Sequence, residues 1–386
     1  MKKYKLLHII TGLNTGGAER ALYNLLYGGI KDHFNCYVIS LLDEGTYGAK
    51  IKKLGVPVLT IGIKRGIPSP ASIYKLRQAI QKIQPDIIQG WMYHGNFAAA
   101  MACKWVSPTS RVIWNVRQSL YDITFEKRAT RLIITFGKFL SKNIDTVIYN
   151  SRISRKQHEK FGFSPRFGIV IPNGIDTNRF KFVEENRIMI RNELAIPLET
   201  IVIGMIARFH PMKNHKLFLK AAVKIAQEFN HIFFVLAGNG ITFNNSMLAD
   251  LIPSDLRAKF KLIGERDDVA ELLCAMDIVS SSSSYGEGFP NVIGEAMASE
   301  LPCVVTDVGD CAYIVGDTGI IVPPRNGEEL QASLVKMLSL PTNYRKKLGV
   351  NARLRIKEKF SLPACVERYV ALYENLLGRN FSACAA

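Results

Sequence analysis

Two carboxylates, Glu287 and Glu295, stand eight positions apart in SSSSYGEGFPNVIGEAMAS, residues 281–299. Glycines flank the first carboxylate and allow a sharp turn, and Pro290 suits the first position of a helix, where its missing N–H costs nothing. Apolar residues then recur at helical spacing, which predicts a helix with one buried face. The segment therefore predicts a loop that carries Glu287, followed by a helix that carries Glu295 more than one turn inside it.

The space between these carboxylates faces the predicted helix N-terminus, whose free N–H groups and positive dipole end favour anions. Carboxylates bind sugar hydroxyls and the helix end favours phosphate. The pattern therefore suits a ligand that is part polyol and part diphosphate, and a nucleotide sugar is such a ligand. The alternative is a helix with a solvated glutamate after a glycine-rich turn.

Two cations stand at the end of a predicted strand in GMIARFHPMKNH, residues 204–215. Arg208 leaves the strand at its carboxyl end, and Lys213 follows across a short loop before a lysine-rich helix. Cations on both sides of such a turn can hold a diphosphate through charge-assisted hydrogen bonds. A solvated basic loop would have the same residues.

A glycine-rich turn, TGLNTGGAER, joins the first predicted strand to the first predicted helix. Gly12, Gly16 and Gly17 allow the backbone to approach a phosphate. The turn lacks the G-x-G-x-x-G spacing of dinucleotide-binding folds, although Asp43 and Glu44 end the second strand, where a ribose-binding acid would lie. Dinucleotide binding therefore stays open as an alternative.

His94, in GWMYHGNF, follows the predicted strand PDIIQ, so we expect it at the carboxyl edge of the first sheet. A histidine beside Trp91 and Tyr93 can equally be a packed core residue. Its position after a strand makes a functional role the other candidate.

The segment FEKRATRLIITFGKFLSKN, residues 125–143, predicts a basic amphipathic helix. Its apolar face comprises Phe125, Ala129, Leu132, Ile133, Phe136 and Leu140. Its cations are Lys127, Arg128, Arg131, Lys138 and Lys142. Such a helix can lie on an anionic membrane surface, and it can equally be a core-facing helix with a solvated side.

These candidate residues need strands and helices to bring them together. Short apolar runs alternate with helical patterns through both halves of the chain, which predicts parallel sheets of the doubly wound type. The predicted strands lie in KLLHIIT, CYVISLL, VPVLTI, PDIIQG, RVIWNV and DTVIYNS, and then in IVIGMIAR, IFFVLAG, FKLIG, DIVSSS, PCVVTD and GIIVPP.

We therefore predict an α/β protein of two Rossmann-like domains that face a central cleft, because ligands bind beyond the carboxyl ends of parallel strands. The turn-forming residues of IPNGIDTNRF, residues 171–180, mark the change of domain. This gives a first domain of residues 1–180 and a second of residues 181–362, followed by a C-terminal helix in residues 363–386.

Length and composition fit this organisation. The chain has 386 residues, of which 48% are hydrophobic and 22% charged, as expected for two soluble domains. No apolar run reaches the roughly 18 residues that span a bilayer, and MKKYKLLHIITGL at the N-terminus predicts a strand rather than a signal peptide. Seven scattered cysteines without a C-x-x-C pair argue against a disulfide framework or a structural zinc site, and for a reducing cytosol.

Positive charge is concentrated in the first half of the chain. Residues 1–180 hold 27 Lys and Arg against 10 Asp and Glu, a net charge of +17, whereas residues 181–386 hold 23 of each. This asymmetry favours an anionic partner, which could be a phospholipid surface, a lipid diphosphate or nucleic acid.

Several motifs of phosphate, metal and hydrolase chemistry are missing from the sequence. It contains no D-x-D, no G-x-x-x-x-G-K-[ST], no H-E-x-x-H and no G-x-S-x-G. We therefore expect Arg208, Lys213 and helix termini to meet the charge of a diphosphate, without a metal ion or another cofactor.

Five segments, in this order along the chain, resemble family 4 glycosyltransferases: NGIDTNRF, GMIARFHPMKNH, LAGNG, GERDDV and EGFPNVIGEAMA. TGLNTGGAER resembles the N-terminal glycine motif of that family, so the match covers nearly the whole chain. The family comprises retaining, nucleotide-sugar-dependent enzymes with the GT-B architecture.

The resemblance implies a role for each matched residue. Glu287 is expected to contact the donor sugar and support the transition state, and Glu295 to bind the ribose hydroxyls. His94 matches the donor-proximal histidine of the family, whose flanking residues vary. The donor diphosphate is expected at Arg208, Lys213, Gly16 and Gly17, and the donor sugar or ribose also at Gly288, Phe289, Asn291 and Val292. The last helix is expected to cross back onto the first domain.

WMYHGN and WNVRQS resemble segments of bacterial enzymes that build surface polysaccharides. In those enzymes the acceptor is often a polyprenyl-diphosphate glycan at the inner face of the membrane. The resemblance thus implies a hexosyl- or N-acetylhexosaminyltransferase with a UDP-linked donor, cytoplasmic and peripheral to that membrane face. Lys127, Arg128, Arg131 and Lys138 are then expected on the acceptor or membrane surface, and no nucleic-acid partner is expected.

Three other functions stay open. A nicotinamide-dependent oxidoreductase would also use two Rossmann-like halves and acids after the second strand. A non-enzymatic nucleic-acid-binding protein would use the basic half, although no interleaving of aromatic and basic residues supports single-strand binding. An inactive or sugar-isomerising relative of the same fold would share most of these motifs.

Overall fold

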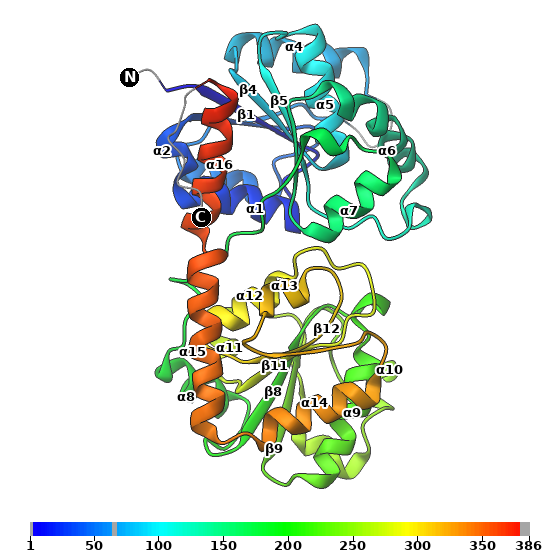
Figure 1. The fold of residues 1–386 in the computed structure, drawn as a ribbon, viewed down its shortest axis with the longest axis vertical. Coiled ribbons are helices and arrows are strands. Elements are labelled where there is room, and N and C mark those ends of the chain that lie inside the picture. Colours follow the sequence, from blue (N-terminus) through cyan, green and yellow to red (C-terminus); the bar gives the residue numbers. More distant parts are fainter. Residues whose placement is uncertain (1–2, 64–67, 379–386) are drawn as a thin grey trace. The chain divides into compact units, whose positions relative to one another are not determined.

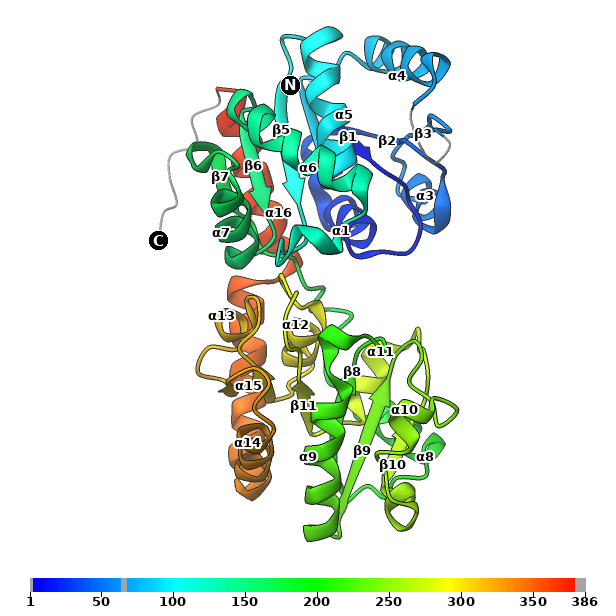
Figure 2. The same cartoon turned by 90° about the vertical axis from the view of Figure 1, so that its right-hand side faces the viewer.

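The computed structural model describes residues 3–63 and 68–378. Its internal contacts divide the chain into two compact units, which Figures 1 and 2 show from two sides. The first unit comprises Met1–Gly174 and Leu362–Ala386, and the second comprises Ile175–Ser361. Each unit has its own sheet and its own core.

The first unit is built on a parallel sheet of seven strands in the order β3-β2-β1-β4-β5-β6-β7. The strands are β1 (Lys5–Ile10), β2 (Asn35–Ser40), β3 (Val58–Thr60), β4 (Ile87–Trp91), β5 (Arg111–Val116), β6 (Thr146–Tyr149) and β7 (Gly168–Val170). Its helices are α1 (Gly17–Leu25), α2 (Lys31–His33), α3 (Gly45–Lys53), α4 (Pro70–Ile83), α5 (Met92–Trp105), α6 (Arg128–Leu140), α7 (Arg152–Phe161) and α16 (Leu362–Leu376), with a π-helical turn at Leu26–Ile30.

The second unit is built on a parallel sheet of six strands in the order β10-β9-β8-β11-β12-β13. The strands are β8 (Ile201–Ile206), β9 (Ile232–Ala237), β10 (Phe260–Leu262), β11 (Ile278–Ser281), β12 (Cys303–Thr306) and β13 (Ile320–Val322). Its helices are α8 (Glu184–Glu193), α9 (His215–Glu228), α10 (Ser246–Ala249), α11 (Val269–Cys274), α12 (Asn291–Ala298), α13 (Cys311–Val315), α14 (Gly327–Ser339) and α15 (Thr342–Lys359).

Each predicted strand is present, and both sheets are parallel and doubly wound, so the predicted fold class of each unit is confirmed. The central strands are apolar and buried on both faces, as in β4, where all five residues are buried. Strand β7, which has three residues and lies at the edge of the first sheet, was not predicted.

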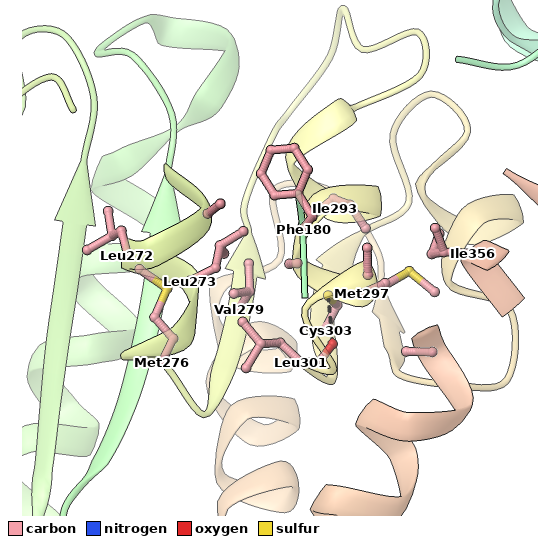
Figure 3. Packing of buried hydrophobic residues seen from close by; sticks show 14 of the residues in the cluster. Phe180, Leu272, Leu273, Met276, Val279, Ile293, Met297, Leu301, Cys303 and Ile356 are labelled. Atoms are coloured by element: carbon pink, nitrogen blue, oxygen red, sulfur yellow. Dashed lines mark hydrogen bonds between the residues drawn. The ribbon is translucent and has the colours of Figure 1, made fainter. Parts of the chain in front are cut away.

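Helices cover both faces of each sheet and bury a core on each. In the first unit α1, α3 and α16 supply one core, and α4, α5 and α6 the other. In the second unit α9 and α14 cover one face, and α11 and α12 pack on the other beside β11. Figure 3 shows this last core, in which Ile293 and Met297 of α12 approach Val279 of β11 and Phe180.

The domain boundary lies earlier than the sequence analysis placed it, so residues 175–180 belong to the second unit. The backbone N–H of Ile175 donates to Phe360 O at 2.8 Å, and Ile175 forms a parallel bridge with Ser361. Phe180 is buried in the core around α12. A turn-forming motif marks a change of chain direction, but packing decides to which core the following residues belong.

The last helix, α16, packs on the first unit. Tyr369 and Tyr373 are buried there, and the Tyr369 hydroxyl accepts from Asn115 Nδ2 at 2.8 Å. The Tyr373 hydroxyl donates to Gln89 Oε1. These bonds reach side chains of the central strands β4 and β5, so the end of the chain completes the core begun by its N-terminal residues.

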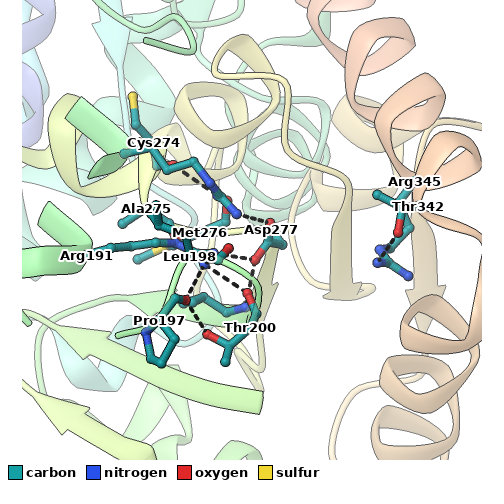
Figure 4. Close-up of polar contacts among 12 residues, drawn as sticks. Arg191, Pro197, Leu198, Thr200, Cys274, Ala275, Met276, Asp277, Thr342 and Arg345 are labelled. Carbon is teal, nitrogen blue, oxygen red and sulfur yellow. Dashed lines mark hydrogen bonds and ion pairs between the residues drawn. The ribbon is translucent and has the colours of Figure 1, made fainter. Parts of the chain in front are cut away.

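Buried Arg191 of α8 holds the amino ends of the strands in the second unit (Figure 4). Its guanidinium donates to Thr200 O at 2.9 Å, to Ala275 O at 3.0 Å and to Asp277 Oδ2 at 2.7 Å. Asp277 precedes β11 and accepts from Val202 N of β8 at 2.8 Å. The network fixes β8 against β11, whose opposite ends carry candidate site residues.

None of the helices in residues 3–63 and 68–378 is long and apolar enough to cross a bilayer.

Candidate functional site

The candidate residues follow the strands at which each sheet changes direction of strand order. This switch point lies between β1 and β4 in the first unit, and between β8 and β11 in the second. Ligands of open parallel sheets bind beyond the carboxyl ends of such strands. Gly16 and Gly17 follow β1, and His94 follows β4. In the second unit Arg208 and Lys213 follow β8, and the loop that carries Glu287 follows β11.

Lys213 and Glu287 are in direct contact. Lys213 Nζ donates to Glu287 Oε1 at 2.5 Å, and Ser283 Oγ donates to the same oxygen at 2.6 Å. The side chains are 18% and 8% exposed, so this ion pair is mostly withdrawn from water. The ammonium has three N–H donors, so Lys213 can bind Glu287 and also donate to an anion. The sequence motifs predicted separate roles for these two residues, and their contact was not predicted.

Hydrogen bonds join the loop after β8 to the loop after β11. Ser282 Oγ donates to Lys213 O at 2.9 Å, and Asn214 Nδ2 donates to Ser284 Oγ at 2.8 Å. The backbone N–H of Ser284 donates to Met212 O at 2.8 Å. The serine run before Glu287 therefore bonds one loop to the other and fixes the position of Lys213 relative to Glu287.

A third loop, after β12, supports Glu287 from behind. Asp310 N donates to Gly288 O at 2.9 Å, and Thr306 Oγ1 donates to Ser283 O at 2.6 Å. Gly309 has φ +66°, and a Cβ there would lie 2.7 Å from Glu287 O and from Gly288 O, so only glycine fits. This support was not predicted from the sequence, although the DVGD run that follows the strand PCVVT is the signal that could have revealed it.

Cys311 is a buried thiol close to Glu287. Its thiol is fully buried, and this burial, together with the nearby Glu287 carboxylate, raises the pKa of Cys311 far above its ordinary value. Cys311 is therefore a thiol at neutral pH, and it packs behind the site without acting as a nucleophile.

Arg208 is exposed at the end of β8, where its backbone is held while its side chain reaches solvent. The next residue, Phe209, donates its N–H to Asn239 O at 2.7 Å. On the other side, buried His215 donates from Nε2 to Ala207 O at 3.2 Å. Burial lowers the pKa of His215 to about 4, so this imidazole is neutral at pH 7.

Helix α12 begins at Asn291, and Pro290 is the residue before its first turn, one position earlier than predicted. Glu295 is the fifth residue of the helix and is buried. Phe289 is also buried, with its ring centroid 5.6 Å from that of Phe360, so it is a core residue. The other predicted sugar- or ribose-binding residues, Gly288, Asn291 and Val292, are half-buried.

The first unit presents a glycine-rich edge that also contains an acid. Gly16 precedes α1 in extended conformation, and exposed Gly17 is the first residue of the helix. A Cβ at Gly16 would lie 2.3 Å from Glu19 Oε2, so this carboxylate lies against the start of its own helix. Burial raises the pKa of Glu19, against the opposite effect of its backbone N–H. Glu19 was not predicted to lie at the expected phosphate site.

Asp43 and Glu44 are engaged within the first unit. Strand β2 ends at Ser40, so both acids lie in the loop beyond it. Asp43 Oδ1 accepts from Asn14 Nδ2 at 3.1 Å, and Glu44 pairs with Lys52 at 2.6 Å. The prediction that these two acids end the second strand is therefore wrong, and the dinucleotide alternative relied on that position.

His94 is the third residue of α5 and is half-buried, whereas its neighbours Trp91 and Tyr93 belong to the core. Strand β4 passes straight into α5 because Met92 adopts a left-handed conformation with φ +60°. Burial lowers the pKa of His94 below 6.5, so its imidazole is neutral at pH 7. The packed-core alternative describes the neighbours of His94, and His94 itself stays at the edge of the sheet.

The basic residues of α6 divide into two kinds. Lys127 and Arg128 are exposed. Arg131 is half-buried, with Nε donating to Glu126 O at 2.7 Å, and the half-buried Lys138 places its ammonium 4.2 Å from the centre of the Phe161 ring. The last two therefore hold the local structure as well as adding charge.

The apolar face predicted for α6 is wrong in part. The residues that meet the core are Ile133, Ile134, Gly137 and Leu140. Phe125, Leu132 and Phe136, predicted on that face, are exposed. Two apolar stripes run along this helix, and the sequence pattern does not say which one packs on the sheet.

In the part of the chain that the structure describes, no group of three or more His, Cys, Asp and Glu side chains could hold a metal ion.

Models of two glycosyltransferase families match the chain. The model described as "Glycosyltransferase Family 4" matches residues 15–179, and the one described as "Glycosyl transferases group 1" matches residues 200–339. Together they span most of both units.

Curated relatives extend over most of the chain. It is 25% identical over 337 residues to the UDP-Gal:alpha-D-GlcNAc-diphosphoundecaprenol alpha-1,3-galactosyltransferase of Escherichia coli, which covers 85% of this chain and 84% of that protein. It is 24% identical over 356 residues to the N,N'-diacetylbacillosaminyl-diphospho-undecaprenol alpha-1,3-N-acetylgalactosaminyltransferase of Campylobacter jejuni, over 88% and 91% of the two chains.

Among solved structures, the Anabaena protein Alr3699/HepE in complex with UDP matches with a TM-score of 0.81 at 21% identity. The match covers 96% of this chain and all of that one. WaaG, a glycosyltransferase involved in lipopolysaccharide biosynthesis, matches with a TM-score of 0.69 at 14% identity, over 95% and 99% of the chains. At these identities the likeness establishes the fold, which is GT-B.

Proposed function

The chain belongs to the family 4 glycosyltransferases, and from this premise we propose that it transfers a sugar, with retention, from a UDP-sugar to a lipid-linked or free glycan. The observation that carries the proposal is the contact between Lys213 and Glu287 at the β8–β11 switch point. It places a cation and a carboxylate in one partly buried position, where a sugar diphosphate needs both.

We assign Glu287 to the donor sugar. Breaking the bond between sugar and diphosphate gives the sugar ring positive character, which a nearby carboxylate stabilises. The hydrogen bonds from Lys213 and Ser283 hold the Glu287 carboxylate in one orientation. Because Lys213 and Ser283 are fixed before the reaction, little reorganisation is needed when charge develops.

We assign Lys213 and Arg208 to the diphosphate, which gains negative charge as it leaves. Their cations, with the N-terminus of α12, stabilise that charge without a metal ion, so we propose a metal-independent transfer. Glu295, Gly288, Asn291 and Val292 are assigned to the ribose and sugar, and Gly16, Gly17 and His94 to the first unit's share of the donor. These assignments rest on the family resemblance and on the positions of these residues beyond the strand ends.

The acceptor that we propose is a glycan on a polyprenyl diphosphate, used in bacterial surface polysaccharide synthesis. Two curated relatives are named for undecaprenyl-diphosphate-linked acceptors. The excess positive charge of residues 1–180 suits such a diphosphate and an anionic membrane. We therefore propose that the enzyme works in the cytoplasm, peripheral to the inner face of the membrane, and that Lys127 and Arg128 contribute to that contact.

A panel of nucleotide sugars, with UDP and NAD alongside, tests the donor. A ligand that binds the folded protein raises the midpoint of thermal unfolding, and at a fixed concentration the rise grows with the logarithm of its affinity. We expect UDP and one UDP-sugar to raise it and NAD to have no effect, with slow hydrolysis of the same UDP-sugar. Stabilisation by NAD and by no nucleotide sugar would contradict the proposal and restore the oxidoreductase alternative.

A further inference from the structure

Helix α6 and the turn before it carry large apolar side chains on the protein surface. Leu132 is 61% exposed, Phe136 58% and Phe139 65%, and Phe125, just before the helix, is 69% exposed. We call these four residues the α6 surface. Leu132, Phe136 and Phe139 are spaced by three or four residues, so they lie along one side of the helix, and Phe125 belongs to the 3-10 turn Ile123–Phe125 just before it.

The α6 surface is additional to the side of the helix that packs on the sheet. Ile134 and Gly137 are buried, and a Cβ at Gly137 would lie 2.9 Å from the Phe163 ring. The helix also packs beside α5, as Figures 1 and 2 show within the first unit. The helix is thus held to its unit by one stripe, while the second stripe faces away from the core. Soluble proteins seldom leave several large apolar side chains together on one surface unless that surface binds something.

Cations flank the α6 surface at both ends. Lys127 and Arg128 are exposed at its start, and Lys142 is exposed just after its last residue. Asp122, Glu126 and Asp145 are the carboxylates nearby in sequence, and Asp145 pairs with Arg111 at 3.1 Å. Glu126 accepts from Gln118 at 2.7 Å, and a hydrogen bond from Thr124 N lowers the pKa of Asp122. Cations around apolar side chains match the headgroups and acyl chains of an anionic bilayer.

We propose that the α6 surface inserts into the headgroup region of an anionic membrane, with Lys127, Arg128 and Lys142 on the phosphates. A second copy of the chain would bring like charges together on a unit whose residues 1–174 carry a net +17, which is unfavourable. This membrane contact rests on the proposed function. It specifies which side chains hold the enzyme at its lipid-linked acceptor. Insertion, and not charge alone, then holds the enzyme there.

Cosedimentation with phosphatidylglycerol-containing vesicles, and with phosphatidylcholine vesicles as a neutral reference, tests the proposal. The decisive variant is Leu132→Ser/Phe136→Ser/Phe139→Ser, whose exposed positions leave no cavity. Its matched control is Tyr344→Ser/Val350→Ser/Leu354→Ser on α15 of the second unit, where the side chains are 53%, 45% and 57% exposed. A second variant, Lys127→Ser/Arg128→Ser/Lys142→Ser, removes the flanking charge.

We expect the α6 triple variant to bind anionic vesicles at least about 100-fold more weakly than the parent, because three apolar side chains no longer leave water. The α15 control should bind as the parent does. Parent binding should fall with salt but persist near 1 M, where the Debye length is about 3 Å. The charge variant should lose the salt-dependent part and keep the rest.

Three results would overturn the inference: an α6 variant that binds vesicles like the parent, an α15 control that loses binding equally, or complete release of the parent by salt. A change of sedimentation coefficient in the α6 variant without lipid would also overturn it, since the surface would then join two copies of the chain. UDP-induced thermal stabilisation is measured in every variant. If UDP fails to stabilise even the parent, the proposed donor is wrong, while the vesicle result still decides the membrane surface.

Discussion

The carboxyl edges of the two sheets are built by different means. In the second unit, side-chain hydrogen bonds from three loops converge on the position of Glu287. In the first unit, the corresponding edge presents exposed Gly17 and half-buried His94, each at the start of a helix. Close backbone packing holds the start of α5 in place, because a Cβ at Gly95 would lie 2.5 Å from Ile9 O. The difference indicates that the chemistry assigned to the second unit needs fixed charges, whereas the first unit provides a surface.

Surface properties divide the same way. The net charge of +17 lies in residues 1–180, and residues 181–386 are neutral overall. The first unit also holds more buried histidines whose pKa is lowered.

The largest expected effect is that the first unit unfolds at a higher pH than the second unit during acidification. Burial lowers the pKa of His8 to about 3 and that of His158 to about 4. Each is neutral when folded and regains an ordinary pKa near 6.5 when unfolded. The unfolded state then binds more protons, so stability falls as pH falls from about 6.5 toward 4, by on the order of 3 kcal/mol for each histidine. The second unit has one such residue, His215.

Tryptophan fluorescence can follow the first unit alone, because Trp91, Trp105 and Trp114 are the chain's three tryptophans. During acid titration we expect their signal to change at a higher pH than the far-ultraviolet circular dichroism, which reports both units. His8→Gln should move the fluorescence transition to lower pH if that variant folds. Coincident transitions would mean that the two units lose structure together and would remove this contrast.

The next effect concerns the charge of Glu287. Glu287→Gln keeps the size of the side chain and removes the carboxylate, so turnover should fall by about 100- to 1,000-fold. Affinity for UDP, measured by calorimetry, should change little, because the carboxylate is assigned to the sugar. Glu295→Gln should instead weaken UDP and UDP-sugar alike. Identical behaviour of the two variants toward UDP would contradict the assigned roles.

Lys213→Ala should weaken UDP binding by about ten- to a hundredfold, as expected for the loss of one charge-assisted hydrogen bond. Because Lys213 also bonds to Glu287, the two substitutions should not be additive in a double-mutant cycle on turnover. Additive effects would mean that the contact has no part in the reaction.

Two glycines give a matched comparison between the units. Gly309→Ala should destabilise the second unit by about 1–3 kcal/mol, because φ is +66° and the new Cβ meets Glu287 O. Gly17→Ala meets nothing within 4 Å, so the thermal midpoint should be unchanged or slightly raised. UDP-sugar affinity should nevertheless fall in Gly17→Ala if phosphate approaches that backbone. Unchanged affinity would remove the glycine turn from the site.

The smallest expected effect is that of a chelator. If side-chain cations meet the charge of the diphosphate, EDTA should leave turnover within about twofold of the untreated enzyme. Loss of activity that Mg²⁺ or Mn²⁺ restores would show that Arg208 and Lys213 are insufficient and that the leaving group needs a metal ion.

Local patterns predicted much of this molecule because they depend on neighbours in sequence. Apolar runs predicted every strand except β7, whose three residues between a 3-10 turn and a proline give little periodicity. The position of Glu287 before a helix also followed from local glycines and a proline.

Contacts across the fold could not be predicted in the same way. Lys213 and Glu287 are 74 positions apart and meet because β8 and β11 are neighbours in the sheet, an order that no local motif contains. The buried stripe of α6 was predicted only in part for a related reason: both stripes are apolar, and only packing against residues such as Phe163 selects one of them. Local sequence motifs therefore predict candidate site residues, whereas the strand order of the sheet determines which of these residues are in contact.

The docking of α16 on the first unit has a consequence for how the chain is made. Its buried tyrosines bind strands of the first unit, and these strands are synthesised before Ile175–Ser361, whereas α16 is synthesised after it. At about 5–20 residues per second, the first sheet waits on the order of tens of seconds for its last helix. During that time the apolar side chains that α16 will cover stay open to other nascent chains. We expect the newborn protein to need a chaperone at this stage, and a chain that stops before α16 to aggregate through its first unit.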